Sequence, residues 1–187
     1  MKTPLVRLLC AFLVGAMPAV SGAANAVTPE DVAVLRAALA PECERSGTGY
    51  HLLSTKPAGV DSDDHVPADW PEAKELDEKL RARAETPGSW SGIRVCPKVL
   101  VRREGDIDRL IDSAPDLDRG WKNFYDVYRG AHGVLYISLP AYSADGNRAV
   151  IVYGSGCGSL CGYGQVIELE KKDGTWHRVR DQGTWIS

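Results

Sequence analysis

The sequence predicts an α+β fold, in which N-terminal helices are followed by an antiparallel β-meander of four or five strands. Before about residue 130, apolar residues recur at the spacing of amphipathic helices, and from residue 134 they alternate as in half-buried strands. Two Asp-Gly pairs, a strong short-range hairpin signal, separate these strands. The chain of 187 residues is long enough for one domain with a substantial core.

The first 26 residues predict a signal peptide. A positively charged start is followed by the apolar run LLCAFLVGAM and then by AVSGAANA, whose small residues suit a signal peptidase. The apolar run is too short to span a bilayer. We therefore expect a signal peptide over residues 1–26 and a single α+β domain over residues 27–187. The protein should be periplasmic or secreted, with no stable membrane insertion after cleavage.

The charge balance argues against two classes of partner. The chain carries 22 Lys+Arg and 25 Asp+Glu, a formal net charge of −3, and the predicted signal peptide contains basic but no acidic residues. The remaining chain is therefore more acidic still, with both signs interspersed. This balance argues against binding to nucleic acid or to an anionic membrane surface.

The first helix has recognisable start and stop signals. Thr28 can cap it, Pro29 suits its first position, and acidic residues follow where the helix dipole favours them. Leu35 and Leu39 belong to one apolar stripe. Pro41 is expected to end the helix.

The next part of the chain predicts two strands and a second helix. The run GYHLLST (49–55) is strand-like, and residues 57–68 resemble an acidic loop. A helix is expected from Asp69 to Glu85, since apolar residues share one face and opposite charges lie four residues apart. The run IRVCPKVLVRR (93–103) is strand-like, but Pro97 interrupts it and indicates an edge strand or a bulge.

Two more helices precede the meander. Asp106 can cap a short helix, and a second helix is expected to begin at Asp116. From Trp121 to Tyr128, aromatic residues fall at helical spacing and form the strongest amphipathic stripe of the chain, which should pack on the sheet. Gly130 should end this helix.

The meander consists of VLYISL, RAVIVY, YGQVIELE and TWHRVR, and TWIS closes the chain. SADGN joins the first two runs and KKDG the last two. The segment YGSGCGSLCGYG (153–164) therefore joins the second and third strands.

Four of the five cysteines lie after the predicted signal peptide: Cys43, Cys96, Cys157 and Cys161. An even number in an exported protein indicates disulfides. The close spacing favours Cys157–Cys161, which leaves Cys43–Cys96 as the long-range pair.

Other chemistries fit the glycine- and cysteine-rich segment less well. It lacks the Gly-Lys-Ser/Thr ending of a phosphate loop, and a strand follows where such loops start a helix. A closed zinc site needs four ligands, and no second close cysteine pair exists. A thioredoxin-like motif has two residues between its cysteines, whereas this segment has three. We therefore expect a structural disulfide, with no metal and no cofactor.

A hairpin closed by this disulfide would have a rigid tip, and rigid tips are good recognition surfaces. The candidate binding residues are Gly156, Gly158, Ser159, Leu160 and Tyr163. The glycines are expected to supply the positive φ angles that such a tight path requires.

No catalytic residue can be named from spacing. The acidic run DSDDH (61–65) lacks the glycine and the distal glutamate of a calcium loop, so a solvated loop is expected. No Gly-x-Ser-x-Gly elbow is present, and the histidines are scattered. A pair of catalytic carboxylates stays open, since acidic residues are plentiful.

The C-terminal half contains, in order, GWKNFYDVY, CGSLCGYG, ELEKKDGTWHRV and a terminal WIS. In this order it resembles a group of small secreted bacterial proteins, largely uncharacterised, with a Cys-Gly-x-Leu-Cys-Gly-x-Gly loop and a final Trp-Ile/Val-Ser. The resemblance implies an exported domain with this meander and carries no particular reaction.

Taken together, these features predict an exported, non-catalytic binding or interaction module whose ligand is a protein or a cell-envelope component. An inhibitor or immunity-type protein is one version of this hypothesis. The alternative is a periplasmic enzyme, either a carboxylate-based hydrolase or a thiol–disulfide protein.

Overall fold

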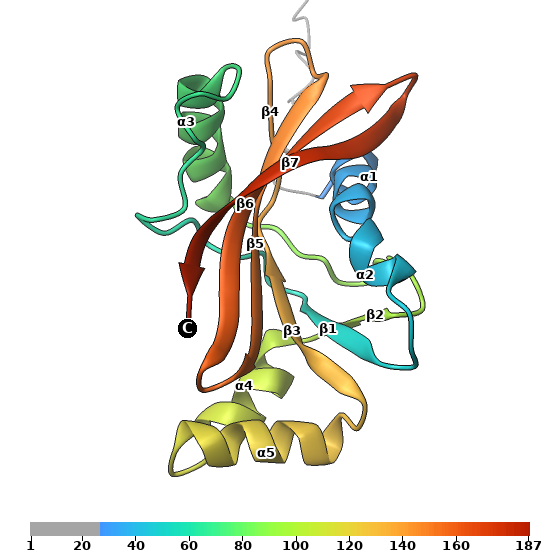
Figure 1. The fold of residues 1–187 in the computed structure, drawn as a ribbon, viewed down its shortest axis with the longest axis vertical. Helices are drawn as coiled ribbons and strands as arrows, with labels where there is room; N and C mark the ends of the chain where they lie inside the picture. The colour runs from blue at the N-terminus through green and yellow to red at the C-terminus, as the bar shows by residue number, and fades with distance from the viewer. Residues whose placement is uncertain (1–26) are drawn as a thin grey trace, which may run out of the picture.

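The computed structural model describes residues 27–187, which form a mixed α and β fold around one seven-stranded sheet (Figure 1). The predicted signal peptide, residues 1–26, lies outside the described residues. The helices in chain order are α1 (Pro29–Ala38), α2 (Ala40–Glu44), α3 (Ala73–Ala84), α4 (Glu104–Asp112) and α5 (Leu117–Val127). The strands are β1 (Tyr50–Ser54), β2 (Val99–Arg102), β3 (Ala131–Ile137), β4 (Ala141–Tyr142), β5 (Arg148–Gly158), β6 (Cys161–Lys172) and β7 (Thr175–Ile186).

The sheet is antiparallel only in its C-terminal part. Its strand order is β2-β1-β3-β5-β6-β7, and β4 also pairs with β5. Successive neighbours from β3 to β7 are antiparallel, which confirms the predicted meander. However, β1 is parallel to both β2 and β3, so the expectation of an antiparallel sheet is wrong for this half.

The parallel pairs explain where the helices lie. Parallel neighbours need long crossover connections, usually helical. The connection from β1 to β2 contains α3, and the connection from β2 to β3 contains α4 and α5. All five helices precede the meander that begins with β3, but α3, α4 and α5 follow the first strand of the sheet, so the expectation of N-terminal helices is wrong for these three.

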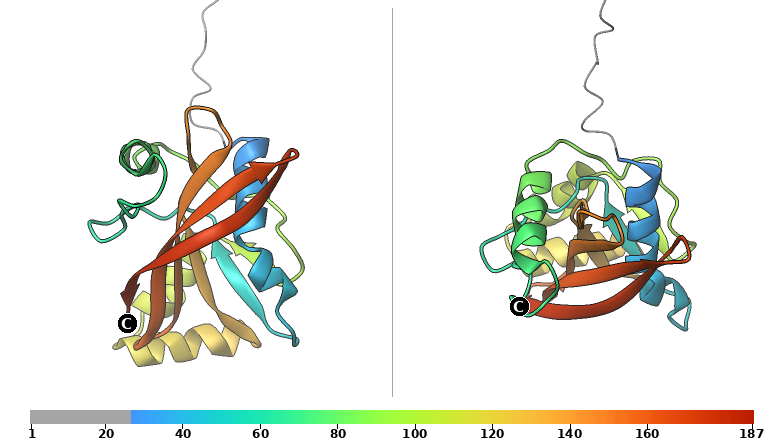
Figure 2. Two further views of the ribbon diagram at one scale, coloured as in Figure 1. Left: turned by 45° about the horizontal axis from the view of Figure 1, so that its top comes forward. Right: turned by 90° about the horizontal axis from the view of Figure 1, so that it is seen from above.

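Helices cover both faces of the sheet, as Figure 2 shows for α1 and α3. On one face, Leu35 of α1 and Leu39, which directly follows the helix, pack in a core that includes Ile151 of β5. On the other face, α3 packs near Val150, and α4 and α5 cover the end formed by β1 and β3. Val150 and Ile151 lie in different cores because successive residues of a strand point to opposite faces.

The N-terminal helix begins as predicted and ends differently. Thr28 and Asp31 form a capping box, with the Thr28 hydroxyl accepting from the Asp31 N–H. Pro41 does not end helical structure. Because proline is tolerated in the first turn of a helix, it lies at the start of α2.

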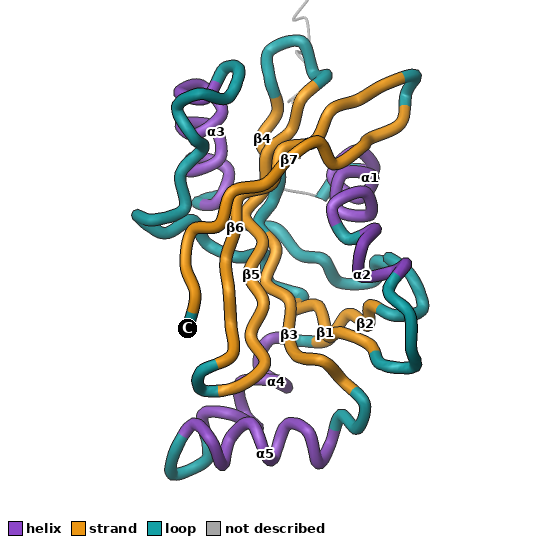
Figure 3. Tube along the Cα trace, viewed as in Figure 1, coloured by secondary structure: helices purple, strands orange, loops and turns teal. Residues whose placement is uncertain are grey.

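The long hairpin of β5 and β6 extends to the end of the sheet that α5 covers (Figure 3). Only Ser159 and Leu160 lie between the two strands. The next hairpin, between β6 and β7, turns through Asp173 and Gly174, both with positive φ as an Asp-Gly turn requires. Within residues 27–187, no helix combines the length and the apolar character that crossing a membrane demands.

Candidate functional site

The predicted tip of the β5–β6 hairpin is cross-linked. Cys157, near the end of β5, is bonded to Cys161 at the start of β6, with 5.0 Å between the Cα atoms. The second disulfide joins Cys43 in α2 to Cys96 just before β2, with a Cα separation of 6.0 Å. The close pair therefore closes a small ring around Ser159 and Leu160.

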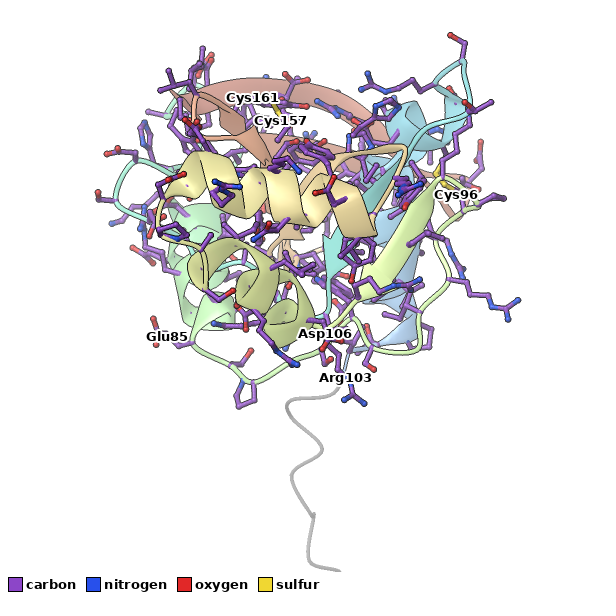
Figure 4. The ribbon with its side chains drawn as sticks, turned by 90° about the horizontal axis from the view of Figure 1, so that it is seen from below. Glu85, Cys96, Arg103, Asp106, Cys157 and Cys161 are labelled. Carbon is purple, nitrogen blue, oxygen red and sulfur yellow. A yellow bond between two sulfur atoms is a disulfide. The ribbon has the colours of Figure 1, made fainter. Side chains whose placement is uncertain are left out.

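The tip is also fixed against helix α5, beside which Cys157 and Cys161 lie in Figure 4. The Tyr125 hydroxyl donates to the Cys157 carbonyl at 2.8 Å, and the Ser159 hydroxyl bonds to the Asp118 carboxylate. Burial raises the pKa of Tyr125, which keeps its hydroxyl protonated as a donor. The tip is thus held by one disulfide and by two hydrogen bonds to α5.

Large apolar side chains are exposed at and beside the tip. Leu160 is 88% exposed and Ile186 is 90% exposed, while Tyr163 and Trp185 are also exposed. Tyr163 pairs with Ile186 across β6 and β7, so these two side chains lie on the same face of the sheet. We call Leu160, Tyr163, Trp185 and Ile186 the tip surface, which includes both faces of the sheet because Trp185, next to Ile186 in β7, points to the opposite face. None of the four side chains is charged.

The glycines of this hairpin serve packing. Gly156, Gly158, Gly162 and Gly164 are absent from the positive-φ residues of the described chain, so the expectation of left-handed angles is wrong. Instead, a Cβ on Gly164 would lie 2.0 Å from Trp185 Nε1, and a Cβ on Gly162 would lie 3.1 Å from the same ring. Glycine leaves room for Trp185 to lie flat on β6.

Gly156 belongs to the same packing arrangement. A Cβ there would meet the Trp121 ring of α5 at 3.5 Å, an ordinary contact. Of the predicted binding residues, the structure therefore places Gly158, Ser159 and Leu160 at the tip and Tyr163 beside it. Gly156 faces α5.

The acidic loop supports the end of β7 next to the tip surface. Asp64 is buried, accepting hydrogen bonds from the Asp61 N–H at 3.2 Å and from the Thr184 hydroxyl at 2.9 Å. The expectation of a solvated loop is therefore wrong at Asp64. Its carboxylate holds the residue that precedes Trp185.

A buried polar network, which the sequence analysis missed, continues inward from Tyr163. The Tyr163 ring stacks on Tyr153 at a centroid distance of 5.7 Å, and the Tyr153 hydroxyl donates to Glu42 Oε1 at 3.1 Å. The other Glu42 oxygen accepts from Arg45 at 2.9 Å and lies 3.4 Å from His51 Nδ1. No spacing rule connects these residues, since α2, β1 and β5 meet only in the folded chain.

The electrostatics of this network favour a structural role. Burial lowers the pKa of His51 and outweighs the opposite effect of Glu42, so the imidazole is neutral near pH 7. Burial likewise raises the pKa of Tyr153, which keeps its hydroxyl a donor. Because Glu42 and His51 are both buried, the hydrogen bonds of the network satisfy polar groups that would otherwise lack partners inside the protein.

Over residues 27–187, no group of three or more His, Cys, Asp or Glu side chains is arranged to hold a metal ion. Comparison with protein-family models, with curated proteins and with solved structures finds no match to this chain. The geometry of the tip therefore carries the functional argument alone.

Removing the tip disulfide tests whether it is a structural staple. We expect the Cys157→Ser/Cys161→Ser variant to lose about 2 kcal/mol in the free energy of unfolding, because the bond closes a ring of few residues and restricts the unfolded chain little. Urea denaturation of the oxidised protein measures this loss. A wild-type protein with two free thiols at residues 157 and 161, titrated without denaturant, would show that the bond does not form.

Proposed function

We propose that this chain is an exported, non-catalytic binding module that binds a partner protein through the tip surface. The observation that carries the proposal is Leu160, which is 88% exposed at the end of a hairpin cross-linked directly behind it. A leucine side chain that moves from water into a partner's apolar pocket contributes about 1.5–3 kcal/mol.

The rigidity of the tip makes this burial effective. Binding costs free energy when mobile loops must become ordered, and a loop already held in one conformation avoids that cost. The disulfide, the Tyr125 bond to the Cys157 carbonyl and the Ser159 bond to Asp118 all act before a partner arrives.

The rest of the tip surface supplies contact area around Leu160. Tyr163 and Ile186 extend the apolar surface on one face of the sheet, and Trp185 presents an aromatic ring on the other. Aromatic residues are enriched at the centres of protein interfaces. A single protruding side chain with an apolar surround suits a cleft in another protein. An inhibitor or immunity-type protein, whose target is an enzyme or toxin, is the specific version that this shape favours.

The compartment is part of the proposal. The predicted signal peptide and the two disulfides support a periplasmic or secreted location, since disulfides persist in oxidising compartments. The resemblance of the C-terminal half to small secreted bacterial proteins supports the same location.

Substitution of Leu160 tests the tip surface. The wild-type domain and a Leu160→Asp variant are immobilised and exposed to envelope and secreted proteins from the producing cells, and a retained protein is then purified. We expect Leu160→Asp to weaken that partner's affinity by about 30-fold or more, because a charge would enter an apolar pocket. Isothermal titration calorimetry measures the affinity.

Val127→Asp is the matched control, since Val127 is also an exposed apolar residue but lies at the far end of α5. It should bind as the wild type does. Equal weakening by both substitutions, or none by Leu160→Asp in a folded protein, would place the binding surface elsewhere.

A further inference from the structure

The other end of the sheet presents an open strand edge. In the strand order, β2 is the terminal strand, and its one ladder partner in the described chain is β1. The His51 N–H donates to the Lys98 carbonyl and the Thr55 N–H to the Arg102 carbonyl, both at 2.8 Å. Because the backbone N–H and C=O groups of successive residues point to opposite sides of a strand, those of Val99 and Val101 point away from β1.

Two of these four outward groups already have a partner in the described chain. The Val99 N–H is bonded to the Cys96 carbonyl at 3.2 Å, but the Val101 N–H has no partner within residues 27–187. Among the described residues, the Val101 carbonyl accepts a hydrogen bond from the exposed side chain of the adjacent Arg102 alone. An incoming strand can therefore bond to the Val101 N–H and, by displacing the Arg102 side chain, to the Val101 carbonyl, whereas Cys96 already occupies the edge at the Val99 N–H.

A groove runs along this edge. It has a volume of about 800 Å³, within the usual range of ligand sites, and lies between β2 and residues 91–97. Figure 4 labels three of its lining residues, with Cys96 before β2 and Arg103 and Asp106 after it. The groove is thus long enough to follow the whole exposed strand.

The two sides of the groove differ in chemistry. Val101 faces the core beneath α1, where Ile93 packs against the same cluster. Leu100 and Arg102 point to the opposite face of the sheet, where α4 begins next to Arg103. One side is therefore apolar and the other is basic.

The positive charge of the groove favours an acidic ligand. Three arginines line it, Arg94, Arg102 and Arg103, and Asp106 is the one acidic residue among its described lining. In an added strand, alternate side chains would point to the two sides. Residues facing Ile93 would be apolar, and residues facing Arg102 and Arg103 would be acidic.

We propose that β2 binds an extended segment of a partner protein, in which apolar and acidic residues alternate, as an added strand of the sheet. This site does not depend on the tip surface, since β2 is the first strand in the sheet order and β7 the last.

A synthetic peptide tests the charge requirement. The probe is an end-blocked, fluorescein-labelled octapeptide of alternating Glu and Val, and the comparison peptide replaces Glu with Lys. Fluorescence anisotropy at low ionic strength should show binding of the Glu peptide at least tenfold tighter than that of the Lys peptide. The Arg102→Glu/Arg103→Glu variant should bind the Glu peptide at least tenfold more weakly than the wild type does. The control variant Arg119→Glu/Arg129→Glu has the same charge change at exposed sites outside the groove, and its affinity should be unchanged.

A second pair of variants tests the main-chain contact. Val101→Pro removes the outward N–H and should weaken the Glu peptide at least tenfold, while Val101→Ala, which keeps the N–H, should leave the affinity within about threefold. Near-UV circular dichroism checks that both variants are folded. If Val101→Pro does not fold, the arginine variants alone test the proposal.

Three results would overturn the proposal. The first is equal binding of the Glu and Lys peptides, or no binding of either. The second is a folded Val101→Pro variant that binds as Val101→Ala does. The third is a wild-type dimer, seen by light scattering, that Val101→Pro converts to a monomer, because the edge would then be occupied by a second copy of this chain.

Discussion

Replacing Trp90 with alanine is expected to lower the free energy of unfolding by about 4–5 kcal/mol, the largest effect of any single substitution proposed for this protein. Trp90 is fully buried in the core beneath α1, and its indole N–H donates to the Ile137 carbonyl of β3 at 3.0 Å. Alanine would leave a large cavity and a buried carbonyl without its donor. Urea denaturation followed by far-UV circular dichroism measures the loss.

Trp90→Phe separates the two causes. Phenylalanine keeps most of the apolar volume but cannot donate to Ile137, so its loss should be about 1–3 kcal/mol. It also keeps the prediction testable if Trp90→Ala does not fold. Losses below about 1 kcal/mol for both variants would mean that the residue is not part of the core.

Removing the Cys43–Cys96 disulfide is expected to cost about 4 kcal/mol, twice the loss for the tip disulfide. The bond joins residues 53 apart in the sequence, and a cross-link restricts the unfolded chain more when it closes a longer loop. It also holds α2 against the segment that enters β2. The Cys43→Ser/Cys96→Ser variant is compared with the wild type by urea denaturation without reductant.

The tip variant Cys157→Ser/Cys161→Ser is the internal control, because it removes the same chemistry from a loop of sequence separation 4. Equal losses in the two variants would contradict the chain-entropy explanation. A larger loss at the tip would contradict both stability predictions for the disulfides.

Local signals along the chain identified most elements of the described domain. Asp116 caps α5 by accepting from the Arg119 N–H at 2.7 Å, and Asp-Gly turns β6 into β7. Pro97 precedes β2, which is an edge strand as its position predicted. Each of these features depends on residues a few positions apart, so a local sequence pattern is enough to predict it.

Local sequence patterns did not predict the direction and pairing of the strands. An alternating run shows that a strand has one buried face, but it does not say which neighbour it meets or in which sense. The parallel position of β1 between β2 and β3 follows from how α3, α4 and α5 pack on the sheet. Likewise, Trp90 lies in a segment whose local sequence predicts only a loop, and the β-sheet around it makes it core.

Short-range periodicity, caps and turns were enough to predict most of the helices, the meander and the position of a cysteine-closed tip. The surroundings of that tip depend on contacts between distant parts of the chain. The tertiary structure places Trp185 over Gly164, Asp64 against Thr184, and Glu42 against Tyr153. These partners are separated by 20 to over 100 residues, and no local rule relates them. They meet only in the folded chain. Close packing fills the space over Gly164 with the Trp185 ring, and the buried carboxylates of Asp64 and Glu42 need hydrogen-bond donors from wherever the fold places them.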